Sequence, residues 1–85
     1  MNRLERFYRI DQLLQERTVV ARDAFLDELE ISLATFKRDL EYMRDRFNAP
    51  VVWDADAGGY RYAAKPKAGP KFELPGLWFS ESEAF

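Results

Sequence analysis

The sequence of 85 residues contains neither cysteine nor histidine. Without cysteine the chain can form no disulfide framework and has no thiolate nucleophile. Without histidine it lacks the commonest metal ligand and the usual general base of enzymes. Both absences argue against an enzyme, and we expect no catalytic residue, no metal site and no cofactor.

Long apolar runs are missing as well. No stretch approaches the roughly 20 apolar residues that a membrane-spanning helix requires, and the N-terminal residues lack the apolar segment of a secretory signal. Large apolar side chains are nevertheless frequent enough for one compact core. We therefore expect a single cytoplasmic domain that does not contact a membrane. The large candidates for its core are Phe7, Phe25, Phe36, Phe47, Trp53 and Tyr60.

Charge is nearly balanced but unevenly distributed. The net charge of −2 argues mildly against a nucleic-acid partner, because domains that bind nucleic acids usually carry a basic excess. Acidic residues dominate the segment 22–30, away from most of the basic residues. The basic residues gather in two segments, Lys37, Arg38, Arg44 and Arg46 in the first, and Arg61, Lys65, Lys67 and Lys71 in the second. This separation keeps a nucleic-acid partner open.

Apolar residues at spacings of three and four predict helices over 3–16 and over roughly 22–29. Asn2 and Glu5 match a capping box at the start of the first helix, whereas the second follows Ala21, a poor capping residue. The predicted apolar faces are Leu4, Phe7, Ile10, Leu13 and Leu14 in the first helix, and Phe25, Leu26 and Leu29 in the second.

A third helix is predicted over 33–47, after a tight turn at 30–32. Ser32 is its expected cap, and the sequence Asn48-Ala49-Pro50 ends it. Its apolar stripe is the clearest periodic signal in the chain and consists of Leu33, Phe36, Leu40, Met43 and Phe47. The opposite face is expected to present Ala34, Thr35, Arg38, Glu41, Tyr42 and Asp45, with Lys37 and Arg44 on one flank.

Two strand-like segments, 51–53 and 60–62, follow the third helix and are joined by turn residues at 54–59. The order helix, helix, tight turn, helix, hairpin is typical of an α+β winged helix-turn-helix, in which the hairpin is the wing. We assign this domain to 1–64. A linker is expected over 65–75 from its lysine, proline and glycine content, and 76–85 reads as the start of a connecting helix to a second domain.

The third helix is the expected recognition helix for DNA. In helix-turn-helix proteins the N-terminal residues of the second helix of the motif enter the major groove. Arginine can donate two hydrogen bonds to guanine, and a threonine methyl can pack on thymine. The alternative interpretation, an ordinary surface helix of mixed charge, stays open on the charge pattern alone. The candidate contacts are Ser32, Leu33, Ala34, Thr35, Lys37 and Arg38, with Arg61 of the hairpin reaching a phosphate.

Segment 32–40 resembles the recognition-helix signature of the WYL-domain transcriptional regulators. It reads Ser-Leu-Ala-Thr-Phe-Lys-Arg-Asp-Leu and is followed by Arg44-Asp45-Arg46. Gly59-Tyr60 is similar to the Gly-Tyr pair that closes the wing of that family, and segment 74–80 is similar to the entry into its second domain. The resemblance extends over nearly the whole chain.

The resemblance implies an N-terminal winged domain that binds a double-stranded DNA operator, usually as part of a homodimer. It also implies a C-terminal WYL domain that senses a ligand, often a nucleotide or a nucleic acid. DNA contacts would fall on Thr35, Lys37 and Arg38, and the wing turn on Gly58 and Gly59.

Three features depart from the family pattern. Leu33 stands where a basic residue is common, so that one contact is missing. Glu30 replaces a small turn residue, and a left-handed φ there would be strained. Asp54 and Asp56 make the tip of the expected wing acidic, which argues against deep insertion into a minor groove.

Two functions remain in competition after an enzyme is set aside. The first is a sequence-specific DNA-binding domain of a bacterial transcription regulator, as a repressor or an activator, with a repressor favoured. The second is a winged helix that binds another protein without specific DNA binding, which the acidic net charge would suit.

Overall fold

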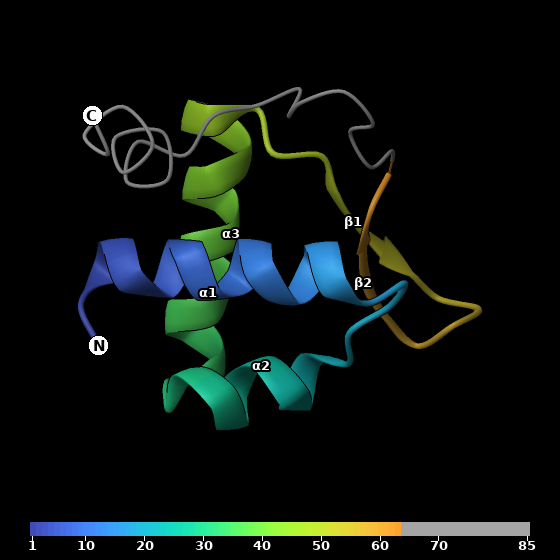
Figure 1. Cartoon of the computed structure of the whole chain (residues 1–85), viewed down its shortest axis with the longest axis horizontal. Helices are drawn as coiled ribbons and strands as arrows, with labels where there is room; N and C mark the ends of the chain where they lie inside the picture. Colours follow the sequence, from blue (N-terminus) through green and yellow to red (C-terminus); the bar gives the residue numbers. More distant parts are fainter. Residues whose placement is uncertain (64–85) are drawn as a thin grey trace.

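The computed structural model describes residues 1–63 as three helices followed by a two-stranded antiparallel hairpin (Figure 1). In chain order the elements are α1 (Arg3–Glu16), α2 (Arg22–Leu29), α3 (Leu33–Phe47), β1 (Val51–Asp54) and β2 (Gly59–Tyr62). The α+β class and the three helix ranges are confirmed. Each strand is one residue longer than the sequence predicted. The expected linker over 65–75 and the helix start over 76–85 lie outside the described residues.

Side-chain caps determine where α1 and α3 begin. At α1, the side chain of Asn2 accepts a hydrogen bond from Glu5 N, and the carboxylate of Glu5 accepts one from Asn2 N, both at 2.8 Å. This is the expected capping box. At α3, Ser32 Oγ accepts from Thr35 N at 3.2 Å. Helix α2 follows Ala21 without a side-chain cap, as the poor capping ability of alanine predicts.

The connection between α2 and α3 reverses at Glu30. Its backbone adopts the left-handed conformation, with φ of 55° and ψ of 49°, and its N–H donates to Leu26 O at 2.8 Å. A side chain in this region costs about 1–2 kcal/mol. Asn48, at the end of α3, has a similar φ of 57°, but asparagine adopts it more readily. Glu30 is therefore the strained position of the two.

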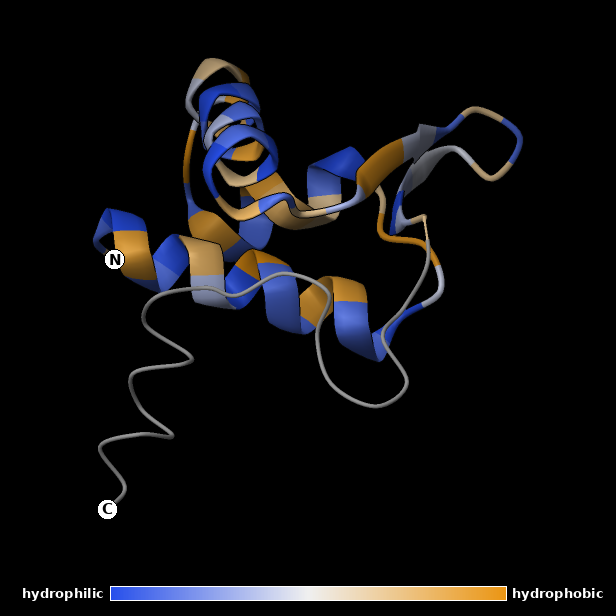
Figure 2. Cartoon of the chain, turned by 90° about the horizontal axis from the view of Figure 1, so that it is seen from above, coloured by the Kyte–Doolittle hydropathy of each residue, from blue (hydrophilic) through white to orange (hydrophobic). Residues whose placement is uncertain are grey.

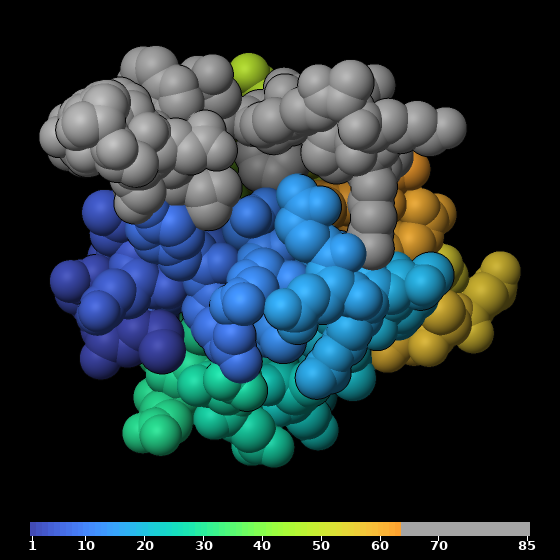
Figure 3. All heavy atoms as spheres, viewed as in Figure 1, coloured from blue at the N-terminus to red at the C-terminus, as the bar shows by residue number. Residues whose placement is uncertain are grey.

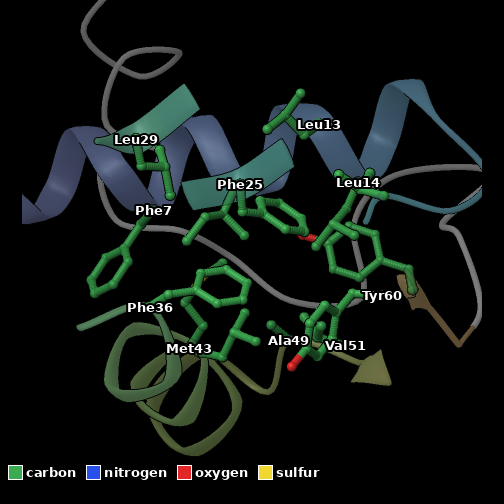
Figure 4. Packing of buried hydrophobic residues seen from close by; sticks show 14 residues of the cluster. Phe7, Leu13, Leu14, Phe25, Leu29, Phe36, Met43, Ala49, Val51 and Tyr60 are labelled. Atoms are coloured by element: carbon green, nitrogen blue, oxygen red, sulfur yellow. The ribbon is translucent and has the colours of Figure 1, made fainter. Parts of the chain in front are cut away.

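Aromatic rings from three elements form the centre of the core (Figure 4). Phe25 of α2 stacks on Phe36 of α3 with ring centroids 4.9 Å apart. Tyr60 of β2 meets the edge of Phe36 at 5.5 Å. Burial of such rings stabilises a small domain strongly, and here it holds the hairpin against the α2–α3 pair. Residues of α1 close the other side of this core, namely Phe7, Ile10, Leu13 and Leu14.

The hairpin is also joined to the segment between α1 and α2. Val20 and Tyr60 exchange two backbone hydrogen bonds of 2.8 Å, from Val20 N to Tyr60 O and from Tyr60 N to Val20 O. A Cβ built on Gly59 would lie 2.6 Å from Val19 Cγ1 and 2.7 Å from Val20 O. Only glycine therefore permits this close approach of β2 to the segment. Val19 and Val20 form the short extended stretch that their β-branched side chains favour.

Three large side chains are placed differently from the sequence-based expectation. Leu4 is 41% exposed, because it lies near the N-terminal end of α1, beyond the edge of the core. Trp53 is 52% exposed, although the ring of Tyr60 packs on it edge to face at 5.0 Å. Tyr42 is half-buried instead of solvated. It stacks on Phe7 at 5.4 Å and meets Phe47 at 5.6 Å.

Two carboxylates are buried, which the sequence analysis did not anticipate. Asp39 of α3 is paired with Arg6 of α1. Asp11 of α1 accepts a hydrogen bond of 2.6 Å from the Tyr62 hydroxyl. Burial raises the pKa of Asp11, and the hydrogen bond from Tyr62 opposes that rise. Both pairs tie α1 to a later element of the chain.

Helix α3 and the hairpin project to the same side of α1. In Figure 2, α3 is seen nearly end-on and the hairpin extends beside it, both on the side away from α1. The turn between the strands protrudes from the body of the molecule (Figure 3). The outer face of α3 and the hairpin therefore lie on a common side of the molecule. No helix within residues 1–63 is long and apolar enough to cross a membrane.

Candidate nucleic-acid interface

The first turns of α3 carry a connected set of polar side chains. Besides capping α3, Ser32 Oγ donates to Thr35 Oγ1 at 3.1 Å. Arg38 Nη2 donates to the same Thr35 oxygen at 3.3 Å. Ser32 and Arg38 are exposed and Thr35 is half-buried. These three side chains, all predicted DNA contacts, therefore form one hydrogen-bonded patch that orients the guanidinium group.

The other predicted contacts on α3 differ in their exposure. Ala34 and Lys37 are exposed, so that both present their side chains to a partner. Leu33 is half-buried and packs against the hydrophobic core. Since its side chain is already held by the protein, Leu33 has less surface to offer than its neighbours. Ser32 and Ala34, at the start of α3, are both exposed.

Most arginines outside α3 are held in ion pairs with carboxylates. The pairs within residues 1–63 are Arg6–Asp39, Arg9–Glu28, Arg22–Asp23 and Arg61–Asp54. In contrast, none of the basic residues of α3 has a carboxylate partner within 4.0 Å in this part of the chain. These are Lys37, Arg38, Arg44 and Arg46. Basic side chains without an ion pair are therefore concentrated on α3, which also carries Glu41 and Asp45, two exposed carboxylates that form no ion pair within residues 1–63.

Arg44 occupies the flank of α3 that faces the hairpin. Its Nε donates to Val51 O at 3.0 Å, which joins the C-terminal half of α3 to the start of β1. A guanidinium group has five N–H donors, so that Arg44 keeps its charge and further donors after this contact. Lys37 lies seven residues earlier, close to the same side of the helix. The sequence placed both residues on one flank, and the contact with Val51 identifies this flank as the one beside β1.

Arg61 does not stand free on the hairpin. Its Nε donates to Asp54 Oδ2 at 3.0 Å, on the neighbouring strand. Asp54 also accepts a hydrogen bond from Ala57 N at 3.1 Å. The pKa of Asp54 is lowered, mainly by the hydrogen bond from Ala57 and then by that from Arg61. Asp54 is therefore ionised at neutral pH, and the charge of Arg61, a predicted phosphate contact, is already partly neutralised.

The two glycines of the hairpin turn have different structural tasks. Gly58 has a φ of 73°, and a Cβ there would meet no atom within 4 Å, so that this position needs glycine for its backbone conformation. Gly59 needs it for the close approach of β2 to Val19 and Val20. Both glycines are therefore required for the structure of the hairpin turn.

Two arginines stack on the ring of Tyr42, a contact that the sequence analysis missed. The guanidinium carbon of Arg3 lies 3.9 Å from the centroid of the Tyr42 ring, and that of Arg46 lies 5.3 Å from it. Arg3 belongs to α1 and Arg46 to α3. The only local signal was an aromatic residue on the otherwise polar face of α3, which by itself does not identify a partner 39 positions earlier.

The carboxylates of residues 1–63 are dispersed or bonded to other side chains. No group of three or more carboxylates within residues 1–63 is arranged to hold a metal ion. The buried carboxylates Asp11 and Asp39 each bond to a side chain of another element. Comparison of the chain with protein families, with curated proteins and with solved structures finds no match. The geometry and charge of the interface are therefore the evidence on which a function is proposed.

Proposed function

We propose that the chain is a winged helix-turn-helix domain that binds double-stranded DNA in a sequence-specific way, as part of a transcription regulator. In this proposal α2 and α3 form the helix-turn-helix, α3 enters the major groove, and the β1–β2 hairpin is the wing. The observation that carries it is the contrast in ion pairing between α3 and the other elements. The basic side chains of α3 form no ion pair within residues 1–63 and are free to meet a phosphate backbone.

Within this proposal the residues of α3 divide into two roles. Arg38 lies on the outer face of the N-terminal half and is held by Thr35, so that it reads a base edge. Lys37 lies on the flank towards β1 and contacts a phosphate. Ser32 and Ala34 line the start of the helix, where free backbone N–H groups favour a phosphate.

The resemblance to WYL-domain regulators extends the proposal to the whole regulator. Two copies would place their α3 helices in half-sites about 34 Å apart or a multiple of that distance, and a second domain would sense a ligand. Linking two weakly binding domains raises affinity through effective concentration. We therefore expect the 85-residue chain to bind DNA more weakly than a dimeric whole regulator.

The decisive experiment compares variants of Arg38 and Lys37 on DNA selected from a random pool and on scrambled DNA. Arg38→Ala is expected to weaken binding to the selected sequence by about 1–3 kcal/mol and to relax preference at one base pair. Lys37→Ala is expected to weaken both DNAs alike, and to lower by about one the slope of log K against log salt. Arg9→Ala is the control, because Arg9 lies on α1, outside the proposed helix-turn-helix, and is paired with Glu28.

Melting temperatures show whether the variants remain folded. Neither Lys37 nor Arg38 belongs to the core, so both variants should stay within about 0.5 kcal/mol of the parent in stability. If all three variants melt normally and bind both DNAs as the parent does, α3 is not the reading helix. Failure of the parent itself to bind any DNA would favour the other candidate function, recognition of a protein.

A further inference from the structure

Tyr42 holds two arginines without neutralising either of them. Arg3 stacks on its ring with 3.9 Å between the guanidinium carbon and the centroid, and also lies 5.6 Å from the centroid of Phe7. Arg46 lies 5.3 Å from the Tyr42 centroid. An aromatic face attracts a guanidinium group but, unlike a carboxylate, leaves its net charge and its in-plane N–H donors unused. This differs from Arg61, which donates to Asp54.

Two carboxylates near this cluster, Glu5 and Asp39, are engaged elsewhere, whereas Asp45, next to Arg46 in the chain, is exposed and forms no ion pair within residues 1–63. Glu5, two residues after Arg3, accepts the hydrogen bond from Asn2 N that completes the cap of α1. Asp39 accepts two hydrogen bonds from Arg6, at 2.6 and 3.1 Å. Neither Arg3 nor Arg46 forms an ion pair with a carboxylate within residues 1–63. Two like charges thus share one ring, and neither forms an ion pair within residues 1–63.

The cluster lies on the flank of α3 opposite to Lys37. At about 100° per residue, Lys37 and Arg46 are separated by half a turn around the helix axis. Arg38, Tyr42 and Arg46 follow one another at intervals of four, so that they form a continuous stripe. Arg38 is therefore flanked on one side by Lys37, towards β1, and on the other by the Tyr42 cluster.

A helix in the major groove has one phosphate backbone along each flank, because the groove is only about 12 Å wide. We infer that Arg3 and Arg46, held by Tyr42, form a phosphate-binding site for the DNA strand on the flank that faces away from the hairpin. This inference rests on the proposed function and extends it. The interface then includes the N-terminal end of α1, which the sequence did not assign to DNA.

The test is a salt series of DNA-binding curves for the 85-residue chain and the double variant Arg3→Gln with Arg46→Gln. Glutamine removes the charge and keeps a polar side chain. Each lost phosphate contact should reduce the magnitude of the salt slope by about 0.9. One phosphate contact with a slope of about 0.9 makes the DNA affinity about eightfold higher at 0.1 M salt than at 1 M salt. The loss of affinity in the double variant should be the same on selected and on scrambled DNA. Arg9→Gln is the matched control on α1, because Arg9 is paired with Glu28.

The role of Tyr42 is tested by combining substitutions. Tyr42→Phe keeps the ring and should keep the affinity, whereas Tyr42→Leu should weaken binding. In the Tyr42→Leu background, Arg3→Gln should have a smaller effect than in the parent, because the arginine is no longer held. Thermal melting checks the fold of each variant, since Tyr42 also packs on Phe7 and Phe47. Additive effects of folded variants would overturn the positioning role.

The outcomes separate this inference from the proposed function. If Lys37→Ala weakens DNA binding but the Arg3 and Arg46 variant binds with an unchanged slope, the phosphate site is wrong and the reading helix stands. If the parent binds no DNA at all, both proposals fail. A titration with inorganic phosphate at constant ionic strength, followed by NMR of the arginine side chains, shows whether the site binds a free anion instead of the DNA backbone. Saturable phosphate binding that the double variant loses, with unchanged DNA binding, would overturn the assignment to the DNA backbone.

Discussion

Arg6 of α1 and Asp39 of α3 form a two-point ion pair, with Arg6 Nε donating to Asp39 Oδ2 at 2.6 Å and Nη2 to Oδ1 at 3.1 Å. The side chain of Asp39 is 5% exposed and that of Arg6 17%. The pKa of Arg6 is raised, mainly by this hydrogen bond. The pair fixes the crossing of α1 over α3, and α3 is the helix that we propose for DNA reading.

Removing one partner of this pair should destabilise the domain more than removing both. Asp39→Ala leaves a largely buried guanidinium without its anion and should cost about 3 kcal/mol. Replacing Arg6 by Met together with Asp39 by Leu should cost less than either single change, since no charge remains buried. Urea denaturation of Asp39→Ala, of the single variants Arg6→Met and Asp39→Leu, and of the double variant measures the difference. A double variant less stable than Asp39→Ala would contradict this account of the pair.

Glu30→Gly should stabilise the protein. Relief of the left-handed strain gains about 1–2 kcal/mol, and the greater freedom of glycine in the unfolded chain returns about 0.4–1 kcal/mol, which leaves a net gain near 0.5–1 kcal/mol. Asn48→Gly is the control at the other non-glycine residue with positive φ within residues 1–63, where the gain should be smaller because asparagine tolerates the conformation. Equal melting temperatures for Glu30→Gly and the parent would refute the strain.

Gly59→Ala should cost more than Gly58→Ala, although the two positions are adjacent. The added methyl at Gly59 would lie 2.7 Å from the carbonyl oxygen of Val20, so that β2 must move away from its bridge; overpacking of this kind costs about 1–3 kcal/mol. At Gly58 only the backbone conformation is strained, by about 1–2 kcal/mol. Hydrogen exchange at the amides of Val20 and Tyr60 provides the sharper readout. It should accelerate selectively in Gly59→Ala.

The contribution of Asp11 to the stability of the protein should increase as the pH falls. Because its pKa is raised in the folded state, protonation favours folding. This contribution is fully present below the ordinary aspartate pKa of about 3.9 and is lost as the pH rises through the folded-state value. Asp11→Asn keeps an acceptor for the Tyr62 hydroxyl and lacks the charge. Its stability advantage over the parent should therefore be greatest at pH 7 and should shrink towards pH 3 in urea titrations, and an advantage independent of pH would contradict this.

The sequence predicted the helices well because their signals are local. The capping residues Asn2 and Ser32 stand next to the helices that they start, and the stripe through Phe36 and Met43 needs only the helical period. Local signals could not predict the contacts that the side chains of Tyr42 and Asp39 make with α1. Both lie towards α1, on a side of α3 that a single apolar stripe leaves to solvent, and their partners are more than 30 positions away in the chain.

The candidate interface was predictable in its location but not in its charge balance. Composition indicated that Lys37 and Arg38 share a basic segment. It did not indicate that Arg61 would be held by Asp54, because that contact depends on the register in which Asp54 faces Gly59. The stacking of Arg3 on Tyr42 depends in turn on the crossing of α1 and α3. Local pattern thus identified the helix, and tertiary contacts decided which cations are held in ion pairs.

Asp54 provides a test in which a single substitution should strengthen DNA binding. Its carboxylate accepts from both Arg61 and Ala57 N. Asp54→Asn keeps an oxygen for the Ala57 hydrogen bond, so that the turn is retained, but it removes the negative charge that holds Arg61. If the hairpin lies against DNA, as we propose, Arg61 is then free to contact a phosphate. Affinity should rise, and the magnitude of the salt slope should increase by up to about 0.9.

Two further variants separate the release of Arg61 from the general loss of a negative charge. Asp56→Asn removes a charge of the same sign from the exposed hairpin turn, and Asp56 forms no ion pair within residues 1–63. Its effect on affinity should be smaller than that of Asp54→Asn. Adding Arg61→Gln to Asp54→Asn should abolish most of the gain, because the cation itself is lost. If Asp54→Asn and Asp56→Asn strengthen binding equally, Arg61 does not reach the DNA and only long-range repulsion has been reduced.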